Sequence, residues 1–137
     1  MIVEVPVFMK KILVIDDMPT MLEQAVKTAG ERYNVITAGS GAEGVQKVFS
    51  ERPDVILLDM YMKDRESFDL MKELKADIET RDIPIIITAA DVSIVAMARG
   101  YSFGAADFMK KPFVEEIMYR KIDMQLQLVE THWTYKE

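Results

Sequence analysis

The chain has 137 residues, 17 basic and 23 acidic side chains, a formal net charge of −6 and no cysteine. A single domain of this size buries enough surface to fold without a disulfide or a structural metal. The lack of cysteine excludes thiol nucleophiles and cysteine-ligated zinc or iron–sulfur sites. The acidic charge argues against direct binding of nucleic acid or anionic membranes, which depends on clustered Lys and Arg.

The first residues do not have the pattern of a targeting signal. Residues 1–9 include Glu4 and Pro6 and lack a basic opening and a small-residue cleavage site, so we interpret them as an N-terminal extension. No apolar run approaches the roughly 18 residues of a membrane-spanning helix. We therefore expect a cytoplasmic protein with one domain over residues 10–130.

Short apolar segments alternate with segments of helical periodicity along the chain. Five segments rich in Val, Ile, Leu or aromatic residues predict buried strands: Lys11–Ile15, Tyr33–Thr37, Asp54–Leu58, Ile83–Ile87 and Ala106–Met109. Apolar residues spaced by three or four positions predict a helix after each strand; these helices start near Met21, Ala42, Phe68, Val92 and Ile117. This alternation predicts an α/β fold, a doubly wound five-stranded parallel sheet with five flanking helices. Its ligand crevice would lie at the carboxyl ends of the strands.

The helix boundaries carry their own signals. Ser40 and Asp91 are the residues expected to cap the helices that follow them. The last helix continues its apolar spacing from Met118 to Trp133, beyond what the sheet can cover. Residues 131–137 are therefore interpreted as a helical tail or linker stub, and three roles stay open for it: a connection to an output domain, a dimer contact, or a frayed end.

Polar residues follow the strands at the edge where this architecture places its site. Asp16 and Asp17 end the first strand, Asp59 the third and Thr88 the fourth, and Lys111 follows the fifth, directly before Pro112. One strand-end Asp alone could serve as a helix cap. Three carboxylates at one edge repel each other, which is tolerable if they hold a hard divalent cation, and Mg²⁺ is the expected ion.

With these residues in this order, the chain resembles the receiver domain of two-component response regulators. The resemblance rests on four segments: Ile12–Asp17, Leu57–Met62, Ile86–Ala90 and Gly104–Phe113. It implies a flavodoxin-like strand order, 2-1-3-4-5. It also implies that Asp59 is the phosphoacceptor, which takes a phosphoryl group from a sensor histidine kinase, a phosphotransfer protein or a small acyl phosphate.

The resemblance further assigns roles around Asp59. Asp16, Asp17, Asp59 and the main-chain carbonyl of Tyr61 would bind Mg²⁺, and Lys111 would pair with the phosphate while Lys110 faces solvent. The chain would be a signalling protein with no chemistry beyond its own phosphorylation and dephosphorylation.

The resemblance also implies a switch. Thr88 would move toward the phosphate and leave room for Phe108 to turn inward, which changes the face formed by the fourth helix, the fifth strand and the fifth helix. That face would control an output domain or effector protein, or form a homodimer. Phe108 as ordinary strand core remains the alternative. The family usually has proline where this chain has Lys63 and glycine where it has Ser67.

Two other classes of protein share part of this pattern. Gly39, Gly41 and Gly44 match the G-x-G-x-x-G pattern of nucleotide-binding α/β enzymes, but the motif follows the second predicted strand rather than the first. A Mg²⁺-dependent phosphatase with an aspartate nucleophile needs an acid two positions further on, where this chain has Met18 and Pro19. His132, in the polar tail, is interpreted as an ordinary surface residue.

Overall fold

The computed structural model describes residues 9–136, with side chains described through Val129. The predicted extension, residues 1–9, lies outside this range except for Met9. Within residues 9–136, no helix combines the length and the apolar character needed to cross a membrane.

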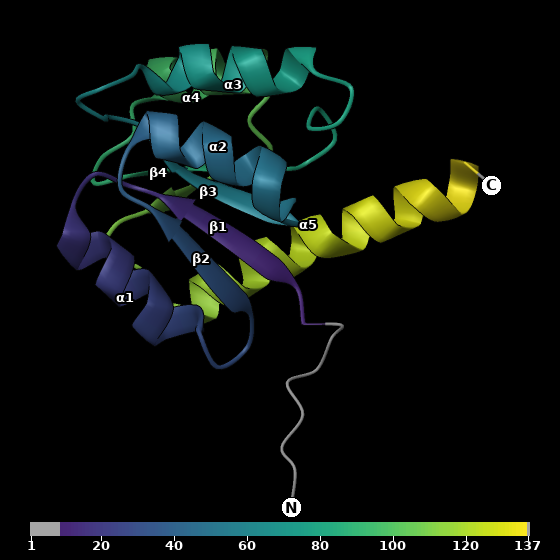
Figure 1. The fold of residues 1–137 in the computed structure, drawn as a ribbon, viewed down its shortest axis with the longest axis horizontal. Coiled ribbons are helices and arrows are strands. Elements are labelled where there is room, and N and C mark those ends of the chain that lie inside the picture. The colour runs from purple at the N-terminus through teal and green to yellow at the C-terminus, as the bar shows by residue number, and fades with distance from the viewer. Residues whose placement is uncertain (1–8, 137) are drawn as a thin grey trace, which may run out of the picture.

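The centre of the molecule is a five-stranded parallel sheet in the order β2-β1-β3-β4-β5, which confirms the predicted fold class (Figure 1). Its strands are β1 (Lys11–Ile15), β2 (Asn34–Ala38), β3 (Val55–Asp59), β4 (Ile85–Ala89) and β5 (Asp107–Lys110). Strands β2 to β5 begin one or two residues later than expected. At β4 the cause is Pro84, which has no N–H to donate and therefore stands just before the strand.

Helices cover both faces of the sheet, as a doubly wound topology requires (Figure 1). They are α1 (Pro19–Ala29), α2 (Gly41–Glu51), α3 (Ser67–Ala76), α4 (Ile94–Ser102) and α5 (Glu115–Lys136). Alternate residues of β1 supply two separate cores. Leu13 packs in the core that contains Val48 of α2, and Ile12 packs in the core that contains Met118 of α5.

The helix caps differ in one place from the expectation. Ser40 caps α2, since its hydroxyl accepts a hydrogen bond from the Glu43 N–H at 3.1 Å. The prediction that Asp91 caps α4 is wrong. The helix begins at Ile94, so Ser93 occupies the N-cap position and its hydroxyl accepts from the Ala96 N–H at 3.1 Å. Asp91 lies two residues too early, and its side chain is 99% exposed.

Helix α5 continues without a break to Lys136, past the end of the sheet (Figure 1). Its first half is held against the body: Met118 and Ile122 are fully buried, and Asp123 accepts a hydrogen bond from the Tyr33 hydroxyl at 2.5 Å. The division between a domain ending at residue 130 and a tail over residues 131–137 stays a prediction, and the side chains of that tail, Trp133 and His132 included, lie outside the described residues.

Candidate functional site

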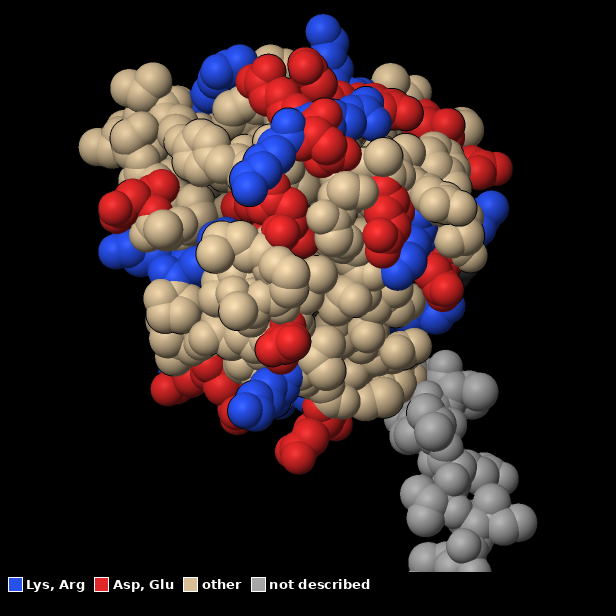
Figure 2. All heavy atoms as spheres, turned by 60° about the vertical axis from the view of Figure 1, so that its left-hand side comes forward, with Lys and Arg blue, Asp and Glu red and all other residues tan. Residues whose placement is uncertain are grey.

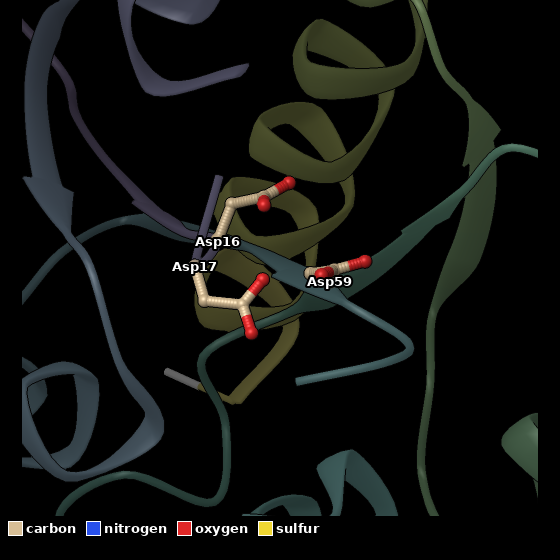
Figure 3. Close-up of side chains that lie close together, drawn as sticks. All are labelled: Asp16, Asp17 and Asp59. Carbon is tan, nitrogen blue, oxygen red and sulfur yellow. The ribbon is translucent and has the colours of Figure 1, made fainter. Parts of the chain in front are cut away.

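Three carboxylates meet at the carboxyl ends of the two central strands, β1 and β3. Strand β1 pairs with β2 on one side and with β3 on the other. The strand order therefore reverses between β1 and β3, which is the switch point of the sheet. The register pairs Ile15 with Leu58 and so places Asp16 and Asp17 beside Asp59. Figure 3 shows the three side chains lying close together, with Asp17 pointing toward Asp59. One carboxylate oxygen from each lies within 4.8 Å of one from each of the other two.

Two of these carboxylates are buried together with one cation. Asp16 is 0% and Asp59 3% exposed. The Lys111 ammonium lies 3.0 Å from Asp16 Oδ2 and 3.0 Å from Asp59 Oδ1. The backbone of this residue is held at the end of β5, since the Lys111 N–H donates to the Ala89 carbonyl at 2.8 Å. The Lys110 side chain is 75% exposed and points away.

The charges at the site do not cancel. Burial, joined by the like charge of Asp16, raises the pKa of Asp59 above its ordinary value, although the hydrogen bond from Lys111 opposes this. For Lys111, burial acts to lower the pKa, but hydrogen bonds to Asp16 and Asp59 outweigh it and the pKa is raised. One ammonium therefore faces three carboxylates, and an excess of negative charge remains at a set of oxygen ligands. This donor set fits a hard divalent cation such as Mg²⁺.

The loop after β3 closes the site from one side. Asp17 Oδ2 accepts a hydrogen bond from the Lys63 N–H at 2.9 Å, and Asp59 Oδ1 lies 3.4 Å from the Tyr61 N–H. Tyr61 is 72% exposed, and its contact with Asp59 is made by the backbone N–H. The loop ends where the buried Ser67 hydroxyl donates to the Met60 carbonyl at 2.7 Å.

Thr88 and Phe108 lie on neighbouring strands. Thr88 pairs in register with Asp59 across β3 and β4 and is 2% exposed. Phe108 is 6% exposed, and its ring meets the Tyr101 ring edge to face at 5.2 Å. The ring therefore already lies inward, as an ordinary core residue would; under the switch interpretation this is the inward state of the Phe108 equilibrium.

The structure gives the glycine motif a packing role. Gly41 N–H and Ala42 N–H, at the start of α2, donate to the Asp64 carboxylate at 2.9 and 3.1 Å. A Cβ on Gly44 would lie 2.6 Å from Ile15 Cδ1, so this glycine allows α2 to approach β1 closely. A nucleotide phosphate would need the N–H groups that Asp64 already occupies.

Sequence reasoning missed two contacts of this loop. Neither the Lys63 N–H bond to Asp17 nor the Asp64 bonds to α2 has a signal in the sequence, because Lys63 and Asp64 are two of many charged residues in a polar segment. Both contacts depend on how the loop folds back over residues distant in the chain.

Seen with the strand ends turned toward the viewer, the surface carries acidic and basic side chains interspersed among uncharged ones (Figure 2). Asp16 and Asp59 are buried and take little part in this surface, which mixes both signs of charge. This is the usual composition of a protein surface.

Comparison with known proteins agrees with the geometry. The family model described as "Response regulator receiver domain" matches residues 12–123. Protein PilH of Pseudomonas aeruginosa is 33% identical over 119 residues, which cover 86% of this chain and 98% of PilH. DNA-binding response regulator MtrA of Mycolicibacterium smegmatis is 29% identical over 86% of this chain, but the match spans only 51% of MtrA.

A solved structure shows the same fold. The chemotaxis protein CheY4 of Vibrio cholerae superposes with a TM-score of 0.82 and 27% sequence identity, covering 86% of this chain and 99% of CheY4. Fold, site geometry and sequence similarity therefore agree: the chain belongs to the response regulator receiver domain family of two-component phosphorelay proteins.

Proposed function

We propose that Asp59 is the residue that accepts the phosphoryl group. The observation that carries this proposal is the buried Asp16–Lys111–Asp59 arrangement, in which one ammonium contacts both carboxylates at 3.0 Å. The Asp59 side chain is 5% exposed and ends a central strand, so its oxygen is held at a fixed place in the crevice. Burial raises the pKa of Asp59 and the hydrogen bond from Lys111 opposes this rise; the ionised carboxylate supplies the nucleophilic oxygen.

The transfer forms one bond and breaks one. An Asp59 carboxylate oxygen attacks the phosphorus of a phosphohistidine on a sensor kinase or phosphotransfer protein, or of a small acyl phosphate. The bond from phosphorus to the donor nitrogen or oxygen breaks, and the donor leaves with that electron pair. Lys111 lies close enough to exchange its contact with Asp59 Oδ1 for one with a phosphoryl oxygen.

Asp16, Asp17, Asp59 and the main-chain carbonyl of Tyr61 are the proposed ligands of Mg²⁺. The three carboxylates support this because each offers one oxygen within 4.8 Å of one from each of the others. When bound, the ion neutralises charge that develops on the transferring phosphoryl oxygens. Asp17 is the least buried of the three and accepts the Lys63 N–H, so it faces the side from which a donor would approach.

The face formed by α4, β5 and α5 is proposed to transmit the signal to a partner. Phosphorylation of Asp59 adds acceptor oxygens beside Thr88, whose hydroxyl turns toward them and shifts the equilibrium of Phe108. Exposed apolar side chains support a docking role for this face: Ile94, Val95, Tyr101 and Ile117. Its partner would be an output domain, an effector protein or a second copy of the chain.

Two further features of the family are proposed for this chain. It would catalyse no reaction on an external substrate, only its own phosphorylation and dephosphorylation. It would act in the cytoplasm, where a sensor kinase presents its phosphohistidine.

Incubation with acetyl phosphate and Mg²⁺, followed by intact mass measurement, tests the proposal. We expect one phosphoryl increment in the wild type and in the Asp91→Asn control, none in Asp59→Asn, and none when EDTA replaces Mg²⁺. An increment that persists in Asp59→Asn would contradict the assignment.

A further inference from the structure

The proposed function does not account for the carboxylate at the start of α2. Asp64 belongs to the loop between β3 and α3, yet its two oxygens accept the Gly41 N–H at 2.9 Å and the Ala42 N–H at 3.1 Å. These hydrogen bonds, that from Gly41 first, lower the pKa of Asp64. The carboxylate thereby satisfies two of the N–H groups that a helix start leaves without partners, next to its positive end.

Helix α2 does not depend on Asp64 for its N-cap. Ser40 already supplies it, through the bond from the Glu43 N–H to its hydroxyl. Asp64 binds the two preceding N–H groups instead. What its bonds add is a connection between the helix and a loop more than twenty residues further along the chain.

Gly41 makes this connection possible by having no side chain. A Cβ at this position would lie 2.9 Å from Arg65 Cβ, closer than real Cβ atoms approach other atoms, and 3.4 Å from Asp64 Oδ1. The loop therefore lies directly against the first turn of α2. Packing against this loop thus explains why the second glycine of the G-x-G-x-x-G pattern has no side chain, without any role for a nucleotide.

The same loop carries groups of the candidate magnesium site. The Lys63 N–H, one residue before Asp64, donates to Asp17 Oδ2 at 2.9 Å, and the Tyr61 N–H lies 3.4 Å from Asp59 Oδ1. A proline at position 63 could not make the first of these bonds, because it has no N–H. The position of the Asp17 carboxylate and of the Tyr61 carbonyl thus depends on where the loop is held.

We propose that Asp64 is a positioning residue for Mg²⁺: by docking the β3–α3 loop on the start of α2, at Gly41 and Ala42, it holds Lys63 against Asp17 and Tyr61 against Asp59. This inference rests on the proposed magnesium site. Asp64 does not touch the ion. It acts as an outer-shell group, through the loop that supports the ligands.

Asp64→Asn tests the proposal, with Asp91→Asn as the matched control. Asparagine keeps the size of the side chain, but its amide nitrogen cannot accept the second N–H. Asp91 follows β4 at the same edge of the sheet, and its side chain is 99% exposed, so its substitution removes an equal charge without a structural contact of comparable strength. The Mg²⁺ dissociation constant would be measured by isothermal titration calorimetry, and the urea midpoint of each variant without Mg²⁺.

We expect Asp64→Asn to weaken Mg²⁺ binding about tenfold, the lower end of outer-shell effects on metal affinity, and clearly more than Asp91→Asn does. Equal Mg²⁺ affinity in the two variants would overturn the inference, even if the urea midpoint of Asp64→Asn fell, because Asp64 would then be only a helix cap. Failure of the wild type itself to bind Mg²⁺ would instead contradict the proposed function.

A second variant tests the contact between the β3–α3 loop and α2 without changing any charge. Gly41→Ala pushes a methyl group against Arg65 Cβ, whereas Gly39→Ala adds one where no atom lies within 4 Å. Weaker Mg²⁺ binding in Gly41→Ala alone supports the proposal. Wild-type affinity in a folded Gly41→Ala protein contradicts it.

Discussion

At the residue scale, the buried Asp59 carboxylate, which the proposed function requires, lowers the stability of the folded protein. Burial and the like charge of Asp16 raise its pKa, so the folded state binds a proton on this group more tightly than the unfolded chain does. By linkage, the contribution of Asp59 to stability falls as pH rises from the ordinary value of 3.8 through the raised pKa, and the full cost applies above it. Such sites are commonly less stable than the fold allows.

We therefore expect Asp59→Asn to raise the free energy of unfolding at neutral pH, in buffer without Mg²⁺, on the order of 1 kcal/mol. Lys111 keeps its ion pair with Asp16 in this variant, so no buried cation loses its only partner. Urea unfolding of both proteins at several pH values measures the difference, which should grow as pH rises. A variant less stable than the wild type at pH 7 would contradict this account.

The site residues could be predicted from the sequence because strand ends are visible in it. Asp16, Asp17, Asp59 and Thr88 each follow a run of buried aliphatic residues, and a parallel sheet brings such positions to one edge. The Asp64 contacts could not be predicted, because they depend on the path of the loop and not on a residue pattern.

At the element scale, the close approach of α2 to β1 depends on Gly44. A Cβ there would lie 2.6 Å from Ile15 Cδ1 and 2.9 Å from Ile15 Cγ2, and Ile15 is fully buried. We expect Gly44→Ala to destabilise the fold by about 1–3 kcal/mol, the usual cost of overpacking, reduced by the better helix propensity of alanine. Gly39→Ala is the control in the same urea experiment, since its Cβ would meet nothing within 4 Å. Equal stabilities of the two variants would refute the packing role.

The start of α4 gives a second prediction at this scale. Ser93→Ala removes the hydroxyl that accepts the Ala96 N–H and should cost about 1 kcal/mol. It should also speed amide hydrogen exchange in the first turn of α4. Asp91→Ala should change stability by less than about 0.5 kcal/mol, as surface substitutions do, and a larger effect of Asp91 would restore it as the cap.

The sequence could not distinguish these two caps. Asp91 and Ser93 are both capping residue types and lie two positions apart, so only the start of the helix decides between them. The helix itself, like the other four, was visible from its apolar spacing, because burial on one face imposes that period. Strands β2 to β5 begin one or two residues later than predicted for a related reason. Hydrogen bonding with the neighbouring strand sets where each strand begins, as it does after Pro84.

At the scale of the whole molecule, the sheet brings three carboxylates together that the unfolded chain keeps apart. A cation that binds this cluster stabilises only the folded state, by about 2.7 kcal/mol when its concentration is 100 times the dissociation constant. We expect Mg²⁺ to raise the Tm of the wild type at constant ionic strength, and Asp17→Asn to reduce that shift. An unchanged Tm at saturating Mg²⁺ would count against a metal site.

The topology also explains why the fold class was predictable when single contacts were not. Alternating strands and helices permit few arrangements once crossovers are right-handed, and the order β2-β1-β3-β4-β5 places the switch point between β1 and β3. The charge of −6 has part of its explanation there, since Asp16, Asp17 and Asp59 meet at that edge and the lysine beside them, Lys111, contacts only Asp16 and Asp59.

The central claim is that the phosphoryl group is carried by the Asp59 carboxylate, and chemical mapping tests it most directly. Borohydride reduces an acyl phosphate on aspartate to homoserine, so the phosphorylated protein would be reduced, digested and sequenced by mass spectrometry. The account predicts homoserine at position 59 and unmodified aspartate at positions 16 and 17. Homoserine at either of those positions, or a phosphate that resists reduction on a serine, threonine or histidine, would contradict it.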